Sequence, residues 1–394
     1  ADRDEGREIV ERLGIQPGDL PLMICPNGTV LKRPGNAEAA TCLGMTPDLD
    51  PDALHDVAIV GAGPAGLAAA VYAASEGLSV IVLDQRAIGG QAGASARIEN
   101  YLGFPTGISG QALAGRAYNQ ALKFGAELAI PLEVATLACG GDPDTGSGPA
   151  PHALHLTSGD VVRARTVVIA SGARYRRPDI ENLSLFEGGG VSYWASPVEA
   201  RLCEGEEVAL IGGGNSAGQA VVFLAPKVKT LHLVVRGAGL EASMSRYLID
   251  RIKALPNVVL HTRTELVTLE GDAERGLVGA TYRDRDSGET HHCDLRHVFL
   301  FVGADPNTGW LTDCIALDHA GFVTTGADGA GPGRSTSLQT DRPGVFAIGD
   351  VRAGSVKRVA AAVGEGAAVV SQIHHYLAAA DEAARSDTRE KATA

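Results

Sequence analysis

Features that commonly assign a protein to a class are missing from this sequence. None of its six cysteines stands in a C-x-x-C pair, and no uncharged apolar run reaches 18 residues. Scattered cysteines favour unpaired thiols in a reducing compartment over a disulfide framework, and short apolar runs argue against a membrane span. The first residues also show no basic flank or apolar stretch typical of a secretion signal. We therefore expect a cytoplasmic protein.

Basic side chains are scarce as well. The chain has 34 Lys and Arg against 47 Asp and Glu, for a formal charge of −13, which argues against nucleic acid or an anionic membrane as a partner. Glycine is abundant instead, with 50 in 394 residues, and many glycines follow apolar runs. From residue 55 onward apolar strands alternate with helical patterns, which is typical of an α/β fold with parallel sheets.

The first 53 residues read as a short α+β extension followed by a linker. We expect a helix over 7–14, strands over 20–25 and 29–33 joined by a turn at 26–28, and a helix over 36–45. This order resembles the second half of a thioredoxin-type domain, with Pro21 where that fold has its cis-proline. The alternative is a helix and hairpin docked on the main body.

A first glycine motif follows the apolar strand 57–60. It precedes an alanine-rich helix and a second strand, 80–83, that ends at an acidic residue. Strand, loop, helix, strand and acid in this order form the signature of a dinucleotide-binding unit. The glycines allow a tight turn and a close approach to a pyrophosphate, which the helix N-terminus attracts. The predicted contacts are Gly61, Gly63, Pro64, Ala65, Gly66, Asp84 and Gln85.

A complementary motif lies near the C-terminal end of the chain. The strand 344–348 is followed by Gly349-Asp350 and by a helix that opens near Lys357. This segment resembles that of two-dinucleotide-binding flavoproteins in which the Asp holds the ribityl chain of FAD. We therefore expect a discontinuous FAD domain over 54–176 and 306–380.

A second glycine motif follows the strand 208–211. The next strand, 230–235, ends in Arg236, where an NAD site would have an acid, and a cation there favours NADPH over NADH. Arg246, and less clearly Arg251, could add to a phosphate clamp. We expect an NAD(P)H domain over 177–305, with contacts from Gly212, Gly214, Asn215, Ser216, Ala217, Arg236 and Arg246.

Over residues 55–378 the chain resembles the low-molecular-weight thioredoxin reductases. The motifs that carry the resemblance are VGAGPAG, IGGQAG, IENYLGFP, IASGARYR, IGGGNSA, VGADPNT and FAIGDV. The resemblance implies two Rossmann-like domains, a homodimer, and electron flow from NADPH through FAD to a redox-active cysteine pair. By position it adds Gly90, Gln91, Glu99, Asn100, Gly172, Arg358, Val359 and Ala360 to the flavin contacts.

The chain departs from that family where the cysteine pair belongs. The matching positions read Trp194-Ala195-Ser196-Pro197, and Val198 stands at the usual acid. Thiol–disulfide exchange needs an attacking thiolate and a leaving thiol, so nucleophile, resolving group and proton donor are all predicted to be absent. Trp194 then either stacks on the flavin or packs between the domains, and Ser196-Pro197 reads as a stiff turn. Cys203 is either an inert thiol or a weak catalytic candidate.

Three functions remain open at this point. The first is an FAD-dependent NAD(P)H oxidoreductase with an unknown, non-disulfide acceptor: ferredoxin or flavodoxin, a quinone, a small oxidant or O₂. The second is a disulfide reductase that uses other cysteines or a partner domain, and the third is an NADPH/FAD redox sensor. We predict no metal site, because His291-His292 and His374-His375 are adjacent pairs that read as surface. Residues 381–394 are predicted to form a flexible tail.

Overall fold

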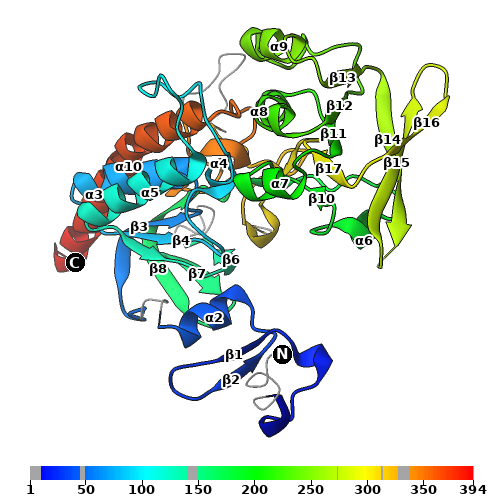
Figure 1. Cartoon of the computed structure of the whole chain (residues 1–394). Coiled ribbons are helices and arrows are strands. Elements are labelled where there is room, and N and C mark those ends of the chain that lie inside the picture. Colours follow the sequence, from blue (N-terminus) through cyan, green and yellow to red (C-terminus); the bar gives the residue numbers. More distant parts are fainter. Residues whose placement is uncertain are drawn as a thin grey trace. The chain divides into compact units, whose positions relative to one another are not determined.

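The computed structural model describes residues 10–44, 49–140, 150–272, 274–311, 314–326 and 337–393 (Figure 1). The chain forms two compact units. The first comprises Ala1–Ile88, Ala117–Gly172 and Thr308–Ala394, and the second comprises Gly89–Arg116 and Ala173–Asn307. The second unit therefore takes up 89–116, a segment that the sequence prediction assigned to the FAD domain.

The first unit is built on a seven-stranded sheet. Its order is β5-β4-β3-β8-β7-β6, with β19 on β8. All pairs are parallel except β6 with β7 and β7 with β8. The strands are β3 Leu54–Val60, β4 Val80–Leu83, β5 Glu127–Ala129, β6 Val134–Ala138, β7 His152–Leu156, β8 Val161–Ile169 and β19 Val345–Ala347. The central strands are buried on both faces, as expected for a parallel sheet covered by other elements.

The second unit contains a five-stranded parallel sheet of order β10-β17-β11-β12-β13 and a three-stranded antiparallel sheet, β14-β15-β16. Helices α7 Pro197–Leu202, α8 Asn215–Leu224 and α9 Arg246–Lys253 pack on one face of the larger sheet. Its other face packs against the smaller sheet. The strands are β10 Val191–Ser192, β11 Glu207–Ile211, β12 Thr230–Val234, β13 Val258–His261, β14 Thr264–Asp272, β15 Gly276–Asp284, β16 Thr290–Asp294 and β17 His297–Leu300; β9 Ala173–Tyr175 pairs with β18 Ala304–Pro306.

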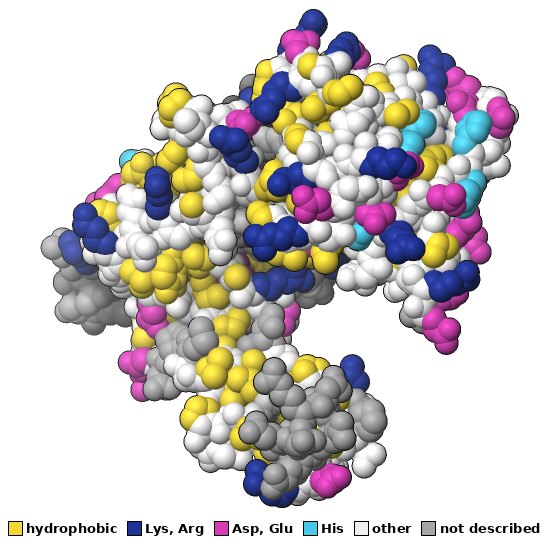
Figure 2. Space-filling view, viewed as in Figure 1, with side chains coloured by type: hydrophobic (Ala, Val, Ile, Leu, Met, Phe, Trp, Pro, Cys, Tyr) yellow, Lys and Arg dark blue, Asp and Glu magenta, His cyan; other side chains and the backbone are white. Residues whose placement is uncertain are grey.

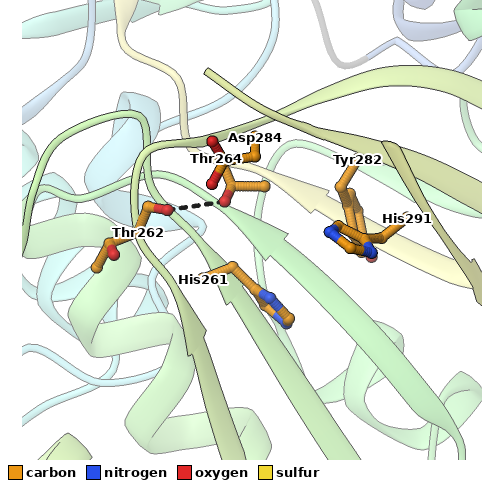
Figure 3. A pocket seen from close by; sticks show the side chains of 6 residues that line it. All are labelled: His261, Thr262, Thr264, Tyr282, Asp284 and His291. Carbon is orange, nitrogen blue, oxygen red and sulfur yellow. Dashed lines mark hydrogen bonds between the residues drawn. The ribbon is translucent and has the colours of Figure 1, made fainter. Parts of the chain in front are cut away.

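Charges of both signs are interspersed on the face of the molecule drawn in Figure 2, with histidines gathered near β15 and β16. Beside these strands the second unit holds a cavity of about 350 Å³ (Figure 3). The residues that line it are His261, Thr262, Thr264, Tyr282, Asp284 and His291. Nothing in the sequence pattern predicted this cavity, because its walls come from separate strands and the turn after β13.

The N-terminal extension has the order of elements that the sequence predicted. Residues 10–12 are helical, the short helix η1 spans Pro17–Asp19, and β1 Leu22–Ile24 pairs antiparallel with β2 Val30–Lys32 before α2 Asn36–Cys42. The Leu20–Pro21 peptide bond is cis. The first part of the helix predicted over 7–14 lies outside the described residues.

Two disulfides correct the expectation of unpaired thiols. Cys25 and Cys42 are bonded within the N-terminal extension, with Cα atoms 5.2 Å apart, and Cys139 and Cys314 are bonded within the first unit, at 6.3 Å. Free thiols remain at Cys203 and Cys293 among the described residues. The sequence argument was wrong because residues that are far apart along the chain can meet in space, and spacing alone does not reveal such pairs.

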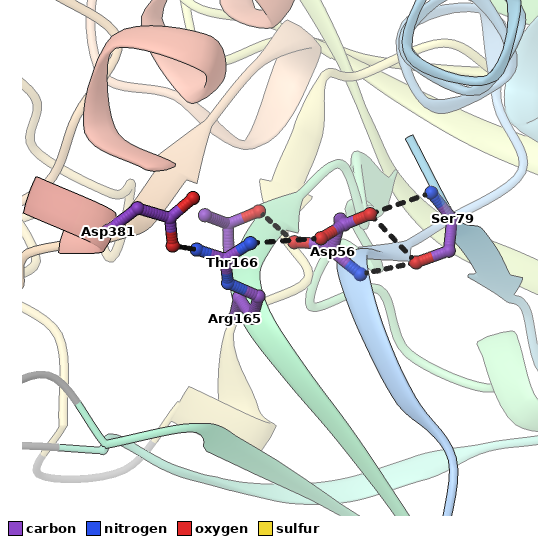
Figure 4. Close-up of polar contacts among 5 residues, drawn as sticks. All are labelled: Asp56, Ser79, Arg165, Thr166 and Asp381. Atoms are coloured by element: carbon purple, nitrogen blue, oxygen red, sulfur yellow. Dashed lines mark hydrogen bonds and ion pairs between the residues drawn. The ribbon is translucent and has the colours of Figure 1, made fainter. Parts of the chain in front are cut away.

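The segment predicted as a flexible tail lies within a helix. Helix α10 runs from Val359 to Thr393 and packs on α3 Pro64–Ser75, where a Cβ on Gly366 would lie 2.5 Å from the Ala65 carbonyl oxygen. The C-terminal residues are rich in Ala, Glu and Arg, which favour helix. Arg165 of β8 contacts both Asp56 and Asp381, so it ties α10 to the sheet (Figure 4). None of the described helices is both long and apolar enough to cross a membrane.

Candidate nucleotide-binding and redox site

The first glycine loop has a backbone that only glycine accommodates. Gly61 has φ +116°, and a Cβ there would lie 2.2 Å from the carbonyl oxygen of Ala170. A Cβ on Gly66 would lie 1.9 Å from the carbonyl oxygen of Gly61, so helix and strand approach as a nucleotide loop requires. Helix α3 begins at Pro64 with no side chain capping its amides. Its N-terminus is therefore left to accept an anion.

Asp84 holds this loop in place. One carboxylate oxygen accepts a hydrogen bond from the backbone N–H of Ala62 and the other from that of Arg86, both at 2.9 Å. A carboxylate oxygen has a second lone pair, so each can still accept a ribose hydroxyl. Gln85, the next predicted contact, is exposed beside it.

The Gly349-Asp350 turn supplies a carboxylate with no donor of its own. Gly349 has φ +72° and donates its N–H to Oε2 of Glu365 at 2.7 Å. Burial raises the pKa of Asp350, and no described residue donates a hydrogen bond to its carboxylate. A half-buried acceptor without a donor fits the hydroxyls of a ribityl chain. The remaining contacts predicted near it, Arg358, Val359 and Ala360, lie at the start of α10.

The second glycine loop repeats the design in the second unit. Gly212 has φ +145°, and a Cβ there would lie 2.4 Å from the carbonyl oxygen of Phe301. A Cβ on Gly214 would meet nothing within 4 Å, so the space before α8 is open. Asn215 begins α8, and its side chain accepts a hydrogen bond from the N–H of Ser245 at 2.7 Å. Ser216 and Ala217 follow in the first turn of the helix.

The segment after β12 is tied to that loop and carries the candidate phosphate cations. Ser243 donates its hydroxyl to the carbonyl oxygen of Gly213 at 2.8 Å. Arg236 is exposed, and its side chain forms no ion pair or hydrogen bond with a described residue. Arg246 is paired with Asp250 at 2.8 Å, and Arg251 is paired with Glu99. Of these three cations, Arg236 is the one without a direct ion pair to an acid in the described part of the chain.

Residues 194–197, which the sequence analysis aligned with the cysteine pair, lead into a helix. Ser196 is the N-cap of α7 and accepts a hydrogen bond from the N–H of Val198 at 3.1 Å, while Glu199 accepts one from the N–H of Ser196 at 3.0 Å. This reciprocal arrangement is a capping box, and Pro197 occupies the first helical position that suits proline. The stiff turn expected at Ser196-Pro197 is therefore a helix start.

Trp194 lies against this cap. Its side chain is 42% exposed, and its Nε1 donates to Oε1 of Glu199 at 3.0 Å. The ring centroids of Trp194 and Tyr175 are 6.5 Å apart. Burial raises the pKa of Glu199, but hydrogen bonds from Ser196, the backbone and Trp194 outweigh it and lower the pKa overall. The sequence analysis overlooked this acid. Because its pKa is lowered, Glu199 is a carboxylate with no proton to donate.

Cys203 is a core residue. It ends α7 with no exposed surface. Burial, with a smaller contribution from nearby Glu199 and Glu206, raises its pKa to about 11. A buried, protonated thiol neither attacks a disulfide nor meets a partner. The structure therefore gives no support to Cys203 as a catalytic residue.

The contacts carried over from the resemblance are divided between the units. Gly172 belongs to the first unit and has φ +65°. Gly90 and Gln91 begin the short helix α4 Gly90–Gly93 of the second unit, where the Gln91 side chain donates to the carbonyl oxygen of Ala173. Asn100 is exposed in the same unit.

Residues 55–366 match the family Pyridine nucleotide-disulphide oxidoreductase. The chain belongs to this family. It is 32% identical over 323 residues to the F component of alkyl hydroperoxide reductase from Escherichia coli, a match that covers 82% of this chain and 58% of that protein. It is also 32% identical to thioredoxin reductase of Streptomyces clavuligerus, covering 83% and 95%. The chain thus spans a little over half the length of the hydroperoxide reductase components that it matches.

Solved structures confirm the predicted fold. Thioredoxin reductase of Lactococcus lactis, in a form described as the FR conformation, superimposes with a TM-score of 0.74 at 25% identity, covering 82% of this chain and 99% of that one. The chain therefore has the α/β fold of thioredoxin reductases, with two Rossmann-like domains. FAD and NADPH, the two predicted cofactors, are those of the thioredoxin-reductase family.

Proposed function

We propose that this protein oxidises NADPH with a bound FAD and passes the electrons to an acceptor that is not a disulfide. The observation that carries this proposal is the capping box at the start of α7. Where the resemblance requires two cysteines, the chain has Trp194 and Pro197. Pro197 begins α7, and Cys203 at the end of this helix is buried. Electrons on the flavin therefore have no disulfide in this segment to reduce.

The described residues have binding and orienting roles in this proposal. The first glycine loop would hold the pyrophosphate of FAD, and Asp350 would accept hydrogen bonds from its ribityl hydroxyls. The second glycine loop and Arg236 would hold NADPH. When bound, the two cofactors supply the redox chemistry, a hydride passing from nicotinamide to flavin. Glu199 would keep the Trp194 indole in a fixed orientation.

The acceptor is proposed as a ferredoxin or flavodoxin, a quinone, a small oxidant or O₂. A cytoplasmic location and a homodimer stay predictions from the sequence and its resemblance. The two disulfides weaken the argument for a reducing compartment, because it depended on unpaired thiols.

Anaerobic mixing with NADPH, and separately with NADH, tests the proposal through the flavin absorbance. We expect NADPH to bleach the flavin rapidly, and the flavin of Cys203→Ser to bleach at the parent rate. Acceptors of the four classes are then screened for reoxidation of the reduced flavin. Rapid reoxidation by oxidised thioredoxin would overturn the proposal. If neither nucleotide bleached the flavin, the redox-sensor alternative would replace it.

A disulfide-reducing role through the N-terminal extension is the second candidate. The Cys25–Cys42 disulfide favours it, because it places a reducible pair in the segment that resembles a thioredoxin-type domain. Two electrons from NADPH would convert this disulfide to two thiols with uptake of two protons. Anaerobic treatment with NADPH, alkylation and peptide mass spectrometry would show modified Cys25 and Cys42, while Cys139 and Cys314 serve as the internal control.

A further inference from the structure

A cluster of three ligating side chains lies in the second unit, outside both glycine loops. Glu207, His232 and Cys293 come from β11, β12 and β16, and their ligand atoms all lie within 4.8 Å of one another. The first two strands belong to the five-stranded sheet and the third to the three-stranded sheet. The cluster therefore lies where the two sheets pack face to face.

The strand registers explain why these residues meet. His232 pairs with Ala209, which lies two residues after Glu207 on β11. The side chains of Glu207, Ala209 and His232 therefore share one face of the larger sheet. Cys293 pairs with Ala280, which is fully buried in the core between the two sheets. The spacing along the sequence gave no sign of this cluster, because its members lie on strands brought together by the fold.

His232 offers a lone pair that nothing else uses. Its Nε2 atom is buried and has no hydrogen-bond partner, and it lies 3.8 Å from Oε2 of Glu207. The other oxygen of Glu207 is held by Lys229 at 2.8 Å, which leaves Oε2 free to bind. A buried ring nitrogen without a partner is costly in a native protein unless a ligand occupies it.

The surroundings of His232 match those of a metal-bound histidine. Its Nδ1 lies 3.0 Å from Nε2 of His261, so the ring can donate its proton there and present Nε2 to an ion. Metal-binding histidines usually donate their second nitrogen in this way, which sets the tautomer and the ring orientation. His261 also lines the cavity of about 350 Å³ (Figure 3).

We propose that Glu207, His232 and Cys293 bind a divalent transition-metal ion of the Zn²⁺ class. Carboxylate oxygen, imidazole nitrogen and thiolate sulfur are the three donors that proteins present to zinc. Binding would release the thiol proton of Cys293 and would connect β11 and β12 to β16, so the ion would cross-link the two sheets. This site replaces the expectation of no metal, which considered only the adjacent histidine pairs.

Zinc binding to the full-length, chelator-treated chain tests the proposal. A competition titration against a chromophoric zinc chelator measures affinity, and zinc K-edge X-ray absorption identifies the donor atoms without interference from flavin colour. We expect the parent chain to show a sulfur scatterer at about 2.3 Å from zinc and Cys293→Ser to lack it. We expect His232→Gln to lose its zinc to the chelator. His292→Gln is the matched control, because His292 lies on the same strand as Cys293 but pairs with Glu270 and Asp294.

Three results would overturn the proposal: no zinc held by the parent chain against the chelator, a sulfur scatterer that persists in Cys293→Ser, or an equal loss in His292→Gln. Far-ultraviolet circular dichroism checks that each variant is folded. If Cys293→Ser or His232→Gln fails that check, His261→Gln decides. Zinc affinity weakened roughly 10- to 100-fold supports an outer-shell role for His261, and unchanged affinity counts against the site.

Discussion

The indole Nε1 of Trp194 donates a hydrogen bond to Oε1 of Glu199 at 3.0 Å, and the other oxygen of the same carboxylate accepts the N–H of Ser196. The Glu199 side chain therefore completes the capping box of α7 and orients the indole of Trp194. The segment 194–199 is therefore a helix start with an indole held against it.

Ser196→Ala should lower the stability of the second unit by about 1 kcal/mol, because it removes the N-cap hydroxyl of α7. Urea unfolding followed by circular dichroism measures the change. Ser245→Ala is the matched control, since Ser245 also stands at an N-cap position but its side chain makes no capping bond. An equal shift in the two variants would contradict the capping role.

Arg236→Ala should raise the KM for NADPH roughly 10- to 100-fold and leave that for NADH unchanged, because a charge-assisted contact to the 2′-phosphate is worth about 1.5–3 kcal/mol. Steady-state kinetics with both nucleotides measure the split. Arg275→Ala provides the control, as this exposed arginine pairs with Asp272 instead of lying at the end of β12. A similar rise for both nucleotides would refute discrimination by Arg236.

Asp350→Asn should weaken FAD retention by roughly tenfold or more, because the amide replaces a charged acceptor for the ribityl hydroxyls. Flavin content after extensive dialysis measures it. In flavin-free protein the same substitution should raise the folding stability. Burial raises the pKa of Asp350 above 3.8, so the folded state binds the extra proton and its stability falls as pH rises through the raised pKa.

The flavin-free Asp350→Asn variant should therefore be more stable than the parent chain at neutral pH and equal to it below pH 3.8, the ordinary pKa of an aspartate. Thermal unfolding across this range makes the comparison. A variant that loses stability at neutral pH would show that the carboxylate has a partner within the protein.

His152 should make the first unit sensitive to acid. It is buried in β7, and burial lowers its pKa from 6.5 to about 4. The unfolded state therefore takes up a proton first, and stability that is complete above pH 6.5 is lost as pH falls toward 4, by up to about 3 kcal/mol. In urea unfolding followed across this pH range, His152→Gln should flatten the slope, and His155→Gln, at an exposed position of the same strand, should not.

The nucleotide motifs could be predicted from the sequence because their requirements are local. Gly61 and Gly212 adopt positive φ angles beside a neighbouring carbonyl group, and this need appears directly as glycine at fixed spacing after an apolar strand. The strands around these loops could also be predicted, because they appear in the sequence as short apolar runs. The resemblance to thioredoxin reductases was carried by these local motifs and was confirmed by the family match.

The tertiary structure decided what depends on distant residues. Cys139 meets Cys314, and His232 meets Cys293, because neighbouring strands and sheets bring them together. The sequence analysis expected a flexible tail after residue 380, but α10 continues there and Asp381 pairs with Arg165 of β8. Local patterns report what each residue prefers over a few neighbours, whereas disulfides, metal ligands and helix docking depend on distances that exist only once the chain has folded.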